Sequence, residues 1–207
     1  MLRILLLAAL IVAVAGYFAP WVWHPAVAFR YSADDLSEFV KFMPAVRSGQ
    51  TPIVRELFFM PIWLASVGVA VWLGSFARQR LIRWPAGLLI IYTAIWPMPM
   101  YPFILDAYRS AEFGLSFWGS VTTAVLSVIA LALGARLPDR ARAGVWMALG
   151  LAGAIIAPLT FAQIKPALDA QHGWILSIGW GIPAVLTGFI AVAAAGVAGW
   201  ARGARRP

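Results

Sequence analysis

Residues 115–135, LSFWGSVTTAVLSVIALALGA, contain no Asp, Glu, Lys or Arg. A helix needs about 20 apolar residues to cross the hydrocarbon layer of a bilayer, and this stretch is long enough to do so. Because lipid offers no hydrogen-bond partners, a crossing segment must pair its own backbone N–H and C=O groups, as a helix does. The stretch therefore predicts a transmembrane helix.

Five further stretches of the chain share this lack of charge: Ile4–Trp23, Phe58–Ala77, Trp84–Leu105, Gly144–Ile164 and Trp174–Ala201. Of all residues 62% are hydrophobic and 12% are charged, which leaves little sequence for a soluble domain. We expect an all-α, polytopic membrane helical bundle that forms one domain over residues 1–207. Its six transmembrane helices are expected at about 4–23, 52–77, 84–105, 115–135, 144–164 and 174–201.

The connectors alternate in charge and so predict an orientation. One set holds ten basic residues and one acid: Arg3, Arg78, Arg80, Arg83, Arg136, Asp139, Arg140, Arg142, Arg202, Arg205 and Arg206. The other set holds six basic and seven acidic residues: Arg30, Asp34, Asp35, Glu38, Lys41, Arg47, Arg55, Glu56, Asp106, Arg109, Glu112, Lys165 and Asp169. The positive-inside rule places the first set and both termini in the cytoplasm, in a bacterial plasma membrane. The net charge of +8 follows from this orientation and from anionic lipid, so no nucleic-acid partner is expected.

An alternative concerns the first stretch. Arg3, the short apolar run after it and Ala13-Val14-Ala15 resemble a secretory signal peptide with its cleavage site. The apolar sequence continues through Trp23, which favours a retained helix. Cleavage would leave five spans and place the N-terminus outside.

The first outer connector predicts an amphipathic helix over residues 33–43. Ser32 is a good N-cap with Asp35 three residues later, and Pro44 is expected to end the helix. Its apolar stripe at i, i+3, i+4 and i+7 consists of Leu36, Phe39, Val40 and Met43. The helix is expected to lie on the membrane surface or over the bundle, or to act as a lid or a docking face for a partner. Thr51-Pro52 then predicts the start of the second long helix.

The third predicted helix is irregular. It is expected to begin at Pro85, and it meets Pro97, Pro99 and Pro102 near its outer end. Regular helix from Pro85 to Trp96 is only about 18 Å long, so the outer third must be kinked, extended or broken. Discontinuous helices often mark transport sites, although proline kinks also occur in ordinary packed bundles.

Small residues recur every four positions in two predicted helices: Ser66, Ala70, Gly74, Ala191, Ala195 and Gly199. Such spacing lets helices approach closely in lipid. The pattern predicts helix packing, either within the chain or against another membrane subunit or a second copy.

The six uncharged stretches contain no carboxylate or amine, which argues against a proton- or ion-coupled pump. The same lack leaves no general acid or base in the bilayer, so we expect no catalytic residues and a non-enzymatic protein. The candidate ligand-binding residues lie near the broken third helix and the outer ends of its neighbours. They are Tyr92, Pro97, Met98, Met100, Arg109, Gln163 and Lys165.

The chain has no cysteine, which excludes disulfides, thiolate catalysis and Cys-based metal centres. Imidazole and thioether groups suit Cu(I), and both histidines fall at the outer edge with the Met-x-Met pattern. This alternative copper site would consist of His24, Met98, Met100 and His172. Otherwise no cofactor is expected.

Three functions follow from these features, in order of preference. The first is an accessory or assembly subunit of a larger membrane complex, favoured by the lack of chemistry, the small-residue faces, the amphipathic helix at 33–43 and the small size of the chain. The second is a small-solute-binding or transport component with an outward-facing site near the broken third helix. In size and topology alone, such a protein is similar to the substrate-binding subunits of energy-coupling-factor vitamin transporters. The third is a membrane enzyme or metal site at the outer edge.

Overall fold

The computed structural model describes residues 2–24, 29–75 and 80–204. The α-helices within these ranges are α1 (Leu2–Phe18), α2 (Ala33–Phe39), α3 (Pro44–Arg47), α4 (Met60–Gly74), α5 (Arg80–Ile95), α6 (Gly114–Leu133), α7 (Asp139–His172) and α8 (Gly181–Ala204). Four short 3-10 helices accompany them: η2 (Val40–Phe42), η3 (Arg55–Phe59), η4 (Phe103–Leu105) and η5 (Ala107–Arg109). A small antiparallel sheet has the order β2–β1–β3, formed by β1 (Val22–His24), β2 (Phe29–Tyr31) and β3 (Ser177–Ile178).

The described part of the chain contains four helical segments that are long and apolar enough to cross a membrane: Arg55–Gly74, Gly114–Leu133, Asp139–His172 and Gly181–Arg202. Two further apolar helices, Leu2–Phe18 and Pro85–Ile95, are shorter. The structure thus confirms a helical protein with several helices of membrane length.

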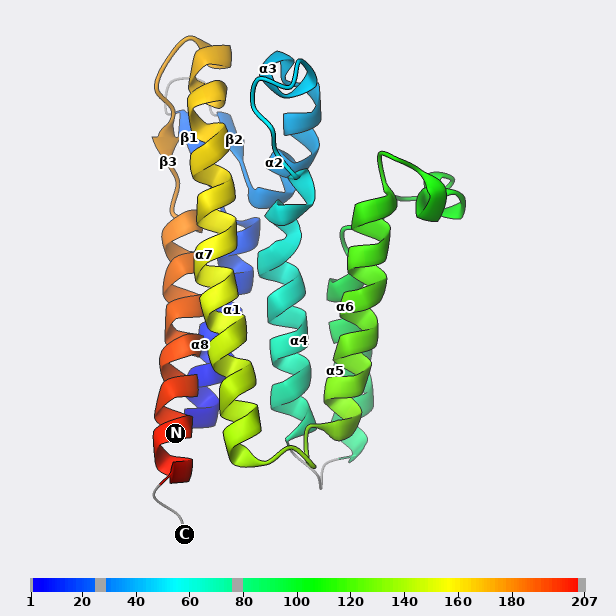
Figure 1. Ribbon diagram of the computed structural model, residues 1–207, viewed down its shortest axis with the longest axis vertical. Helices are drawn as coiled ribbons and strands as arrows, with labels where there is room; N and C mark the ends of the chain where they lie inside the picture. Colours follow the sequence, from blue (N-terminus) through cyan, green and yellow to red (C-terminus); the bar gives the residue numbers. More distant parts are fainter. Residues whose placement is uncertain (1, 25–28, 76–79, 205–207) are drawn as a thin grey trace.

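The long helices run alternately up and down between two ends of the molecule (Figure 1). One end carries the sheet, α2 and α3 and is called the sheet end. The other carries the start of α1, the ends of α4 and α8 and the connector after α6, and is called the terminus end. The described residues of the basic set therefore gather at the terminus end. Within that set, Arg78, Arg205 and Arg206 lie outside the described residues.

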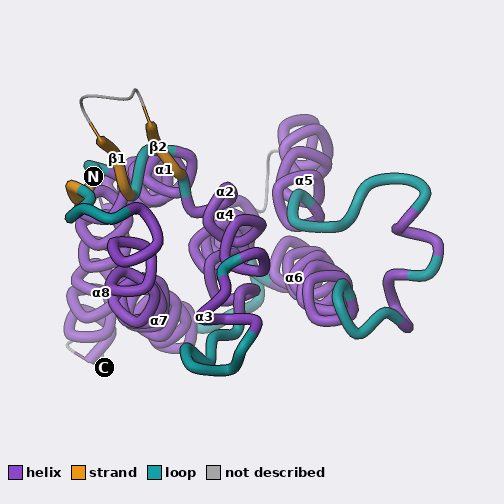
Figure 2. The backbone as a smooth tube through the Cα atoms, turned by 90° about the horizontal axis from the view of Figure 1, so that it is seen from above, coloured by secondary structure: helices purple, strands orange, loops and turns teal. Residues whose placement is uncertain are grey.

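The helices α1, α4, α7 and α8 form a four-helix group, in which α8 packs on α7 and α1, and α4 packs on α1 and α7. The pair α5–α6 packs on α4 and stands apart from the rest of the group (Figure 2). Large side chains fill the group where it meets the sheet end. Trp21 is fully buried there against Phe58 and Phe161, and its Nε1–H donates to the Gly16 carbonyl at 2.9 Å.

The predicted spans 4–23 and 174–201 are too long at the sheet end, where each contains a strand. The first helix ends at Phe18, just before Pro20, which has no N–H to continue it. The backbone N–H and C=O of Trp21 instead bond to the neighbouring strands, at 2.7 and 2.8 Å. These bonds satisfy the backbone between segments far apart in the sequence, so no local pattern announces them.

The second predicted helix, 52–77, begins later than Thr51-Pro52. Its α-helical part starts at Met60 with Pro61 in the first turn, after the lead-in η3. The fixed φ of proline suits the first turn of a helix, and Pro61 rather than Pro52 uses this property. The helix ends at Gly74, and the expected extension through Ala77 lies partly outside the described residues.

The helix found in predicted span 84–105 ends earlier than that span, whereas the helix found in predicted span 144–164 is longer than its span at both ends. Helix α5 begins before Pro85, which lies inside it, and it stops before the Pro-rich segment as expected. The following residues up to α6 hold only turns and the short helices η4 and η5. Helix α7 has 34 residues and continues through Pro158 and Pro166, so it is about 51 Å long and projects beyond a bilayer.

The prediction of an N-capped helix in the first outer connector is confirmed. Ser32 and Asp35 form a reciprocal capping box at the start of α2, with bonds of 2.8 and 3.2 Å. The helix continues as η2, and Pro44 starts α3 rather than only ending α2. Three residues of the apolar stripe are fully buried in the chain's own core: Leu36, Val40 and Met43.

Candidate functional site

A cavity of about 360 Å³ lies at the sheet end, between α2, η3, the start of α6 and the segment that follows α5. We call it the sheet-end cavity. Its lining combines charged, aromatic and thioether side chains from these four elements: Asp34, Ser37, Glu38, Lys41, Arg55, Phe59, Trp96, Pro97, Met98, Pro99, Met100, Phe103, Phe113 and Ser116.

The proline segment creates one wall of the cavity. Helix α5 stops before Pro97 and Pro99 because each proline removes a backbone donor that a helix would need. The chain turns at once, with the Met98 N–H donating to the Ile95 carbonyl at 2.9 Å. Residues 96–100 therefore line the cavity, where a continued helix would have packed against α4 or α6.

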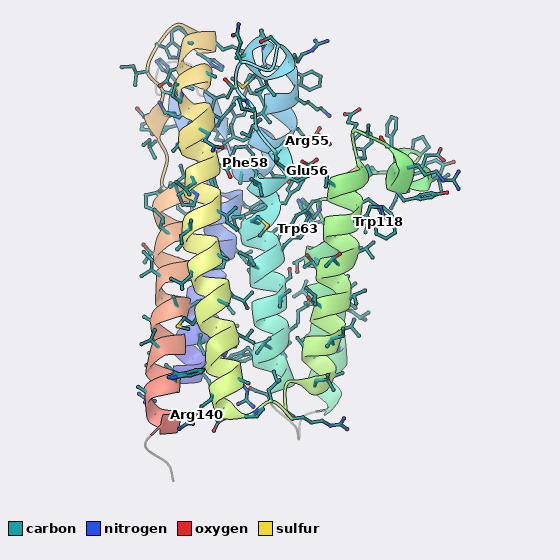
Figure 3. The ribbon with its side chains drawn as sticks, in the orientation of Figure 1. Arg55, Glu56, Phe58, Trp63, Trp118 and Arg140 are labelled. Atoms are coloured by element: carbon teal, nitrogen blue, oxygen red, sulfur yellow. The ribbon has the colours of Figure 1, made fainter. Side chains whose placement is uncertain are left out.

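The opposite wall is a network of ion pairs, which we call the charged wall. Lys41 Nζ lies 2.6 Å from Glu38 and 3.2 Å from Glu112. Arg55 lies 3.2 Å from Glu38 and 3.1 Å from Glu56, and it also donates to the Glu112 carbonyl. Arg55 and Glu56 lie next to each other near the start of α4 (Figure 3). Their side chains are only 12% and 11% exposed. Both cations of the wall are thus already held by carboxylates.

Asp34 differs from the other acids of the cavity because no described Lys or Arg forms an ion pair with it. Its Oδ1 accepts a hydrogen bond of 2.8 Å from the Tyr17 hydroxyl, and the Trp96 side chain also donates to it. Burial raises the pKa of Asp34, and the nearby charges of Asp35 and Glu38 raise the pKa further, against the opposing effect of the two hydrogen bonds. Asp34 is therefore a partly buried carboxylate with neutral donors only.

The sheet-end cavity and its charged wall carry a net negative charge. Four carboxylates face two cations: Asp34, Glu38, Glu56 and Glu112 against Lys41 and Arg55. The Phe113 ring lies under both cations, at 5.8 Å from Lys41 Nζ and 5.7 Å from the Arg55 guanidinium carbon. The other aromatic side chains of the lining are Phe59, Trp96 and Phe103. Negative charge beside aromatic faces is the usual environment for an organic cation.

A row of hydroxyl groups continues below the cavity along the face of α6 that packs on α4. We call it the hydroxyl seam; its four members are all buried and are Ser116, Ser120, Thr123 and Ser127. The Ser120 and Ser127 hydroxyls have no hydrogen-bond partner among the described residues, and neither does Trp63 Nε1. Trp63 points from α4 toward α6 and packs against Gly119, which lies between Ser116 and Ser120 in the sequence of α6, with Thr123 below (Figure 3).

The seven candidate ligand-binding residues are divided by the fold. Pro97, Met98 and Met100 line the sheet-end cavity. The other four do not: Tyr92, Arg109, Gln163 and Lys165. Tyr92 is exposed on α5, Arg109 lies over the Tyr108 ring, Gln163 is exposed on α7, and Lys165 pairs with Asp169 at 2.6 Å.

The candidate copper ligands do not converge on one cavity. His24 stacks on Trp174 at 4.7 Å, and His172 Nδ1 lies 2.9 Å from the Leu168 carbonyl. Met98 and Met100 line the sheet-end cavity, whose lining includes neither histidine. Within the described ranges, no group of three or more His, Asp or Glu side chains is arranged to hold a metal ion.

The residues proposed for helix packing lie largely at contacts inside the chain. A Cβ at Gly74 would overlap the Ala130 carbonyl of α6, and Ala70 is buried in the same interface. Ser66 shares a 2.9 Å hydrogen bond with Thr93 of α5. On α8, Ala195 is buried, and a Cβ at Gly199 would lie 3.3 Å from the Ala143 Cβ, whereas Ala191 is exposed.

The predicted partner face on α2 is also covered by the chain. Besides its three buried members, Phe39 packs its ring on Tyr31 at 4.6 Å. Sequence reasoning missed the other face of this helix, where Asp34, Glu38 and Lys41 recur at i, i+4 and i+7 and line the cavity. That spacing could have indicated a polar helix face at the cavity. Nothing in the sequence marked Phe59, Phe103 and Phe113 as lining residues, because apolar residues are common throughout the chain.

Comparison with known proteins finds no family model, curated protein or solved structure that matches the chain. The function is therefore inferred from the geometry of the sheet-end cavity. That cavity has a size suited to a small molecule, since ligand pockets usually measure about 300–1,000 Å³.

Proposed function

We propose that the chain is a polytopic protein of a bacterial plasma membrane, with six helices across the bilayer and both termini in the cytoplasm. The membrane-length helices α4, α6, α7 and α8 support this proposal, as does the gathering of basic connectors at the terminus end. Helix α1 spans about 25 Å, and the buried Ala19–Trp21 segment extends its path toward the sheet end. The sheet-end cavity then faces outward.

Within this orientation, the protein binds a small organic cation in the sheet-end cavity, as a solute-binding or transport component. The observation that carries the proposal is Asp34, a partly buried carboxylate that receives hydrogen bonds only from neutral groups. A buried charge is stable only when it is paired, and a bound cation would pair it. Trp96 lies beside the same carboxylate and offers an aromatic face to the same ligand.

An anionic ligand fits the cavity less well. Lys41 and Arg55 already contact two carboxylates each and cover the Phe113 ring, so an anion would have to displace these partners. The excess of negative charge around the cavity would also repel it. A cation with an apolar body matches both the charge and the lining.

The test is ligand binding by the purified full chain in neutral detergent. The probes are benzyltrimethylammonium and its neutral carbon isostere of the same shape. We expect the cation alone to bind and Asp34→Asn to weaken binding about tenfold or more, because one ion pair in a partly desolvated site is lost. Asp106→Asn is the matched control, since Asp106 is exposed on the same side of the molecule and does not line the cavity. Equal binding of the isostere, or an equal loss in the control, would contradict the proposal.

An accessory role in a larger membrane complex is the weaker proposal. It was based on small-residue faces and on the apolar stripe of α2, and most of these residues pack inside the chain. The members that keep accessible surface are Phe39, Ala191 and Gly199. Co-purification of stoichiometric subunits that Ala191→Leu releases would favour this role over solute binding.

A further inference from the structure

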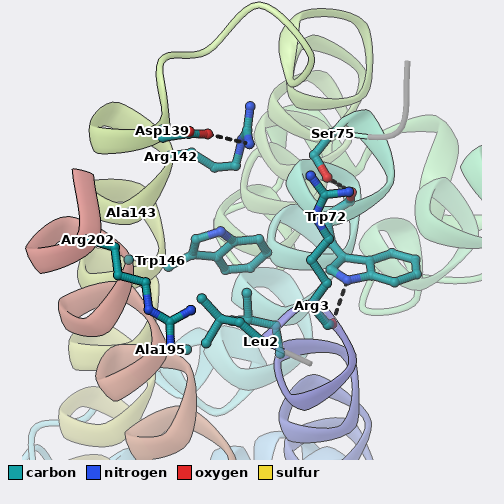
Figure 4. Close-up of a pocket in the computed structure, with 12 residues that line it drawn as sticks. Leu2, Arg3, Trp72, Ser75, Asp139, Arg142, Ala143, Trp146, Ala195 and Arg202 are labelled. Atoms are coloured by element: carbon teal, nitrogen blue, oxygen red, sulfur yellow. Dashed lines mark hydrogen bonds and ion pairs between the residues drawn. The ribbon is translucent and has the colours of Figure 1, made fainter. Parts of the chain in front are cut away.

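A second cavity, of about 310 Å³, lies at the terminus end between the ends of α1, α4, α7 and α8 (Figure 4). We call it the terminus-end cavity. It is separated from the sheet-end cavity by the length of the bundle and shares no lining residue with it. None of the solute-binding chemistry described above involves it.

Three arginines and one carboxylate surround this cavity. Arg3, Arg142 and Arg202 approach from three sides, and Asp139 is the single acid, so two positive charges are in excess (Figure 4). Arg202 forms no ion pair with any described carboxylate, whereas Arg142 lies 3.1 Å from Asp139. The cavity therefore has the charge that attracts an anion.

Arg142 is fixed in place before any ligand binds. Its guanidinium donates to the Gly134 and Leu137 carbonyls at 3.1 and 2.9 Å, which ties α7 to the preceding connector. Its Nε–H is buried and has no hydrogen-bond partner among the described residues. Arg142 therefore presents a positive charge that is already held in position beside the cavity.

The rest of the lining is apolar apart from Ser75, whose hydroxyl donates to the Trp72 carbonyl at 2.7 Å. Leu2, Leu6, Trp72 and Trp146 lie next to the arginines, and Trp146 is almost completely buried between them. The Trp72 Nε1–H donates to the Arg3 carbonyl at 2.8 Å, which holds the start of α1 against α4. A charged rim above an apolar floor suits a ligand that has an anionic head and a hydrocarbon body.

We propose that the terminus-end cavity binds the phosphate group of an anionic membrane lipid, with an acyl chain against the apolar floor. Arginine is suited to phosphate because its planar guanidinium donates two parallel hydrogen bonds. Basic pockets between transmembrane helices on the cytoplasmic side are placed where anionic headgroups lie. A free phosphate ion has the same headgroup chemistry, but it would leave the partly exposed Leu2 and Trp72 side chains uncovered.

The test is native mass spectrometry of the full chain in neutral detergent, titrated with short-chain phosphatidylglycerol. Phosphatidylcholine of the same chain length and inorganic phosphate are the comparison ligands. We expect preferential retention of one phosphatidylglycerol, and a loss of affinity of about fivefold in Arg202→Gln and in Arg3→Gln, since each cation contributes separately. Arg136→Gln should bind as the parent does, because Arg136 is exposed at the same end and does not line the cavity.

The two arginine variants lie near helix ends and outside the core, and a thermal unfolding scan of each establishes that it folds. Equal retention of phosphatidylcholine would overturn the proposal, and so would an equal loss of affinity in Arg136→Gln, which would indicate general surface charge. Displacement of the lipid by inorganic phosphate at similar concentration would assign the site to a free anion. A parent chain that retains no phosphatidylglycerol would also overturn it.

Discussion

The α7–α8 and α4–α6 interfaces both place a glycine where two long helices meet, but the glycines face different partners. A Cβ at Gly150 would overlap the backbone of Ala193, whereas a Cβ at Gly119 would overlap only the Trp63 ring. In the first case two backbones are in contact; in the second, one large side chain lies between them. Small residues therefore do not by themselves define a closed interface, because the partner decides how much space remains.

The difference explains where the sheet-end cavity lies. Near the terminus end α4 and α6 do approach closely, with Gly74 against Gly134. Toward the sheet end Trp63 separates them, and the two helices diverge (Figure 1). The cavity lies above this ring, beside Phe59, whose centroid is 5.6 Å from that of Trp63. The α7–α8 interface contains no such spacer at Gly150, and it stays closed there.

The largest expected effect is at the α7–α8 interface. Gly150→Ala should destabilise the protein by about 3 kcal/mol, because the new methyl group meets backbone atoms that cannot move independently. The matched control is Gly144→Ala on the same helix, where the nearest atom to a Cβ is a Trp200 ring carbon at 3.6 Å. We expect the control to be neutral or slightly stabilising. Thermal unfolding in detergent measures both, and equal effects would mean that α7 and α8 are not in backbone contact.

At the sheet-end cavity, cation binding should depend on pH through Asp34. Since burial raises the pKa of this carboxyl, binding should fall about tenfold per pH unit below that raised pKa, at a higher pH than for an exposed Asp. Stability should change with the opposite sign, because the folded protein holds the proton more tightly than the unfolded chain. The free energy of unfolding of the unliganded protein should therefore decrease as pH rises through the same range.

Isothermal titration with the benzyltrimethylammonium probe measures the affinity as a function of pH. Thermal unfolding measures the stability of the unliganded protein over the same pH range. Asp34→Asn should flatten both curves. If the binding curve kept its shape in the variant, another group would control the site.

Gly119→Ala should have a smaller effect than Gly150→Ala, about 1 kcal/mol, since the far edge of the Trp63 ring can shift. The ring should then move against Phe59 and reduce the cavity, so probe affinity should fall along with stability. Trp63→Phe combined with Gly119→Ala should recover stability relative to the single variant, because the smaller ring leaves room for the methyl group. Failure of this rescue would show that the two helices are held apart by something other than Trp63.

Local features of the sequence predicted much of this arrangement. The break after Ile95 was foreseen because proline acts on its own turn, and the capping box at Ser32 was foreseen because its partners are three residues apart. The strand at 22–24 was not foreseen: it pairs with the nearby strand at 29–31, but also with the strand at 177–178 in a distant part of the chain, which no local pattern indicates. Pattern reasoning extended helices into the first and last of these segments because they are apolar.

The candidate site shows the same limit. Proline spacing identified Pro97, Met98 and Met100, which do line the cavity. The charged wall instead joins Glu38 of α2 to Arg55 of η3, and only the tertiary fold places those elements together. Residues chosen because they lie at the same membrane level, such as Gln163 and Lys165, occupy another face of the bundle. Depth in a membrane specifies one coordinate of a residue and leaves its position around the bundle undefined.

The smallest expected effects concern the hydroxyls of Ser66 and Ser120, which lie where α4 contacts α5 and α6. Ser66 donates to the Ile62 carbonyl at 2.7 Å and shares a bond with Thr93, so Ser66→Ala should cost about 1 kcal/mol. Ser120 has no partner among the described residues, so Ser120→Ala should be neutral or stabilising by a few tenths of a kcal/mol. Both changes remove one oxygen from a buried serine at the contacts of α4, so the losses of packing are comparable. Thermal unfolding measures the difference in stability between the two variants. If Ser120→Ala lowered the stability as much as Ser66→Ala, the Ser120 hydroxyl would be hydrogen-bonded in the membrane. The hydroxyl seam would then form a polar path between α4 and α6 below Trp63.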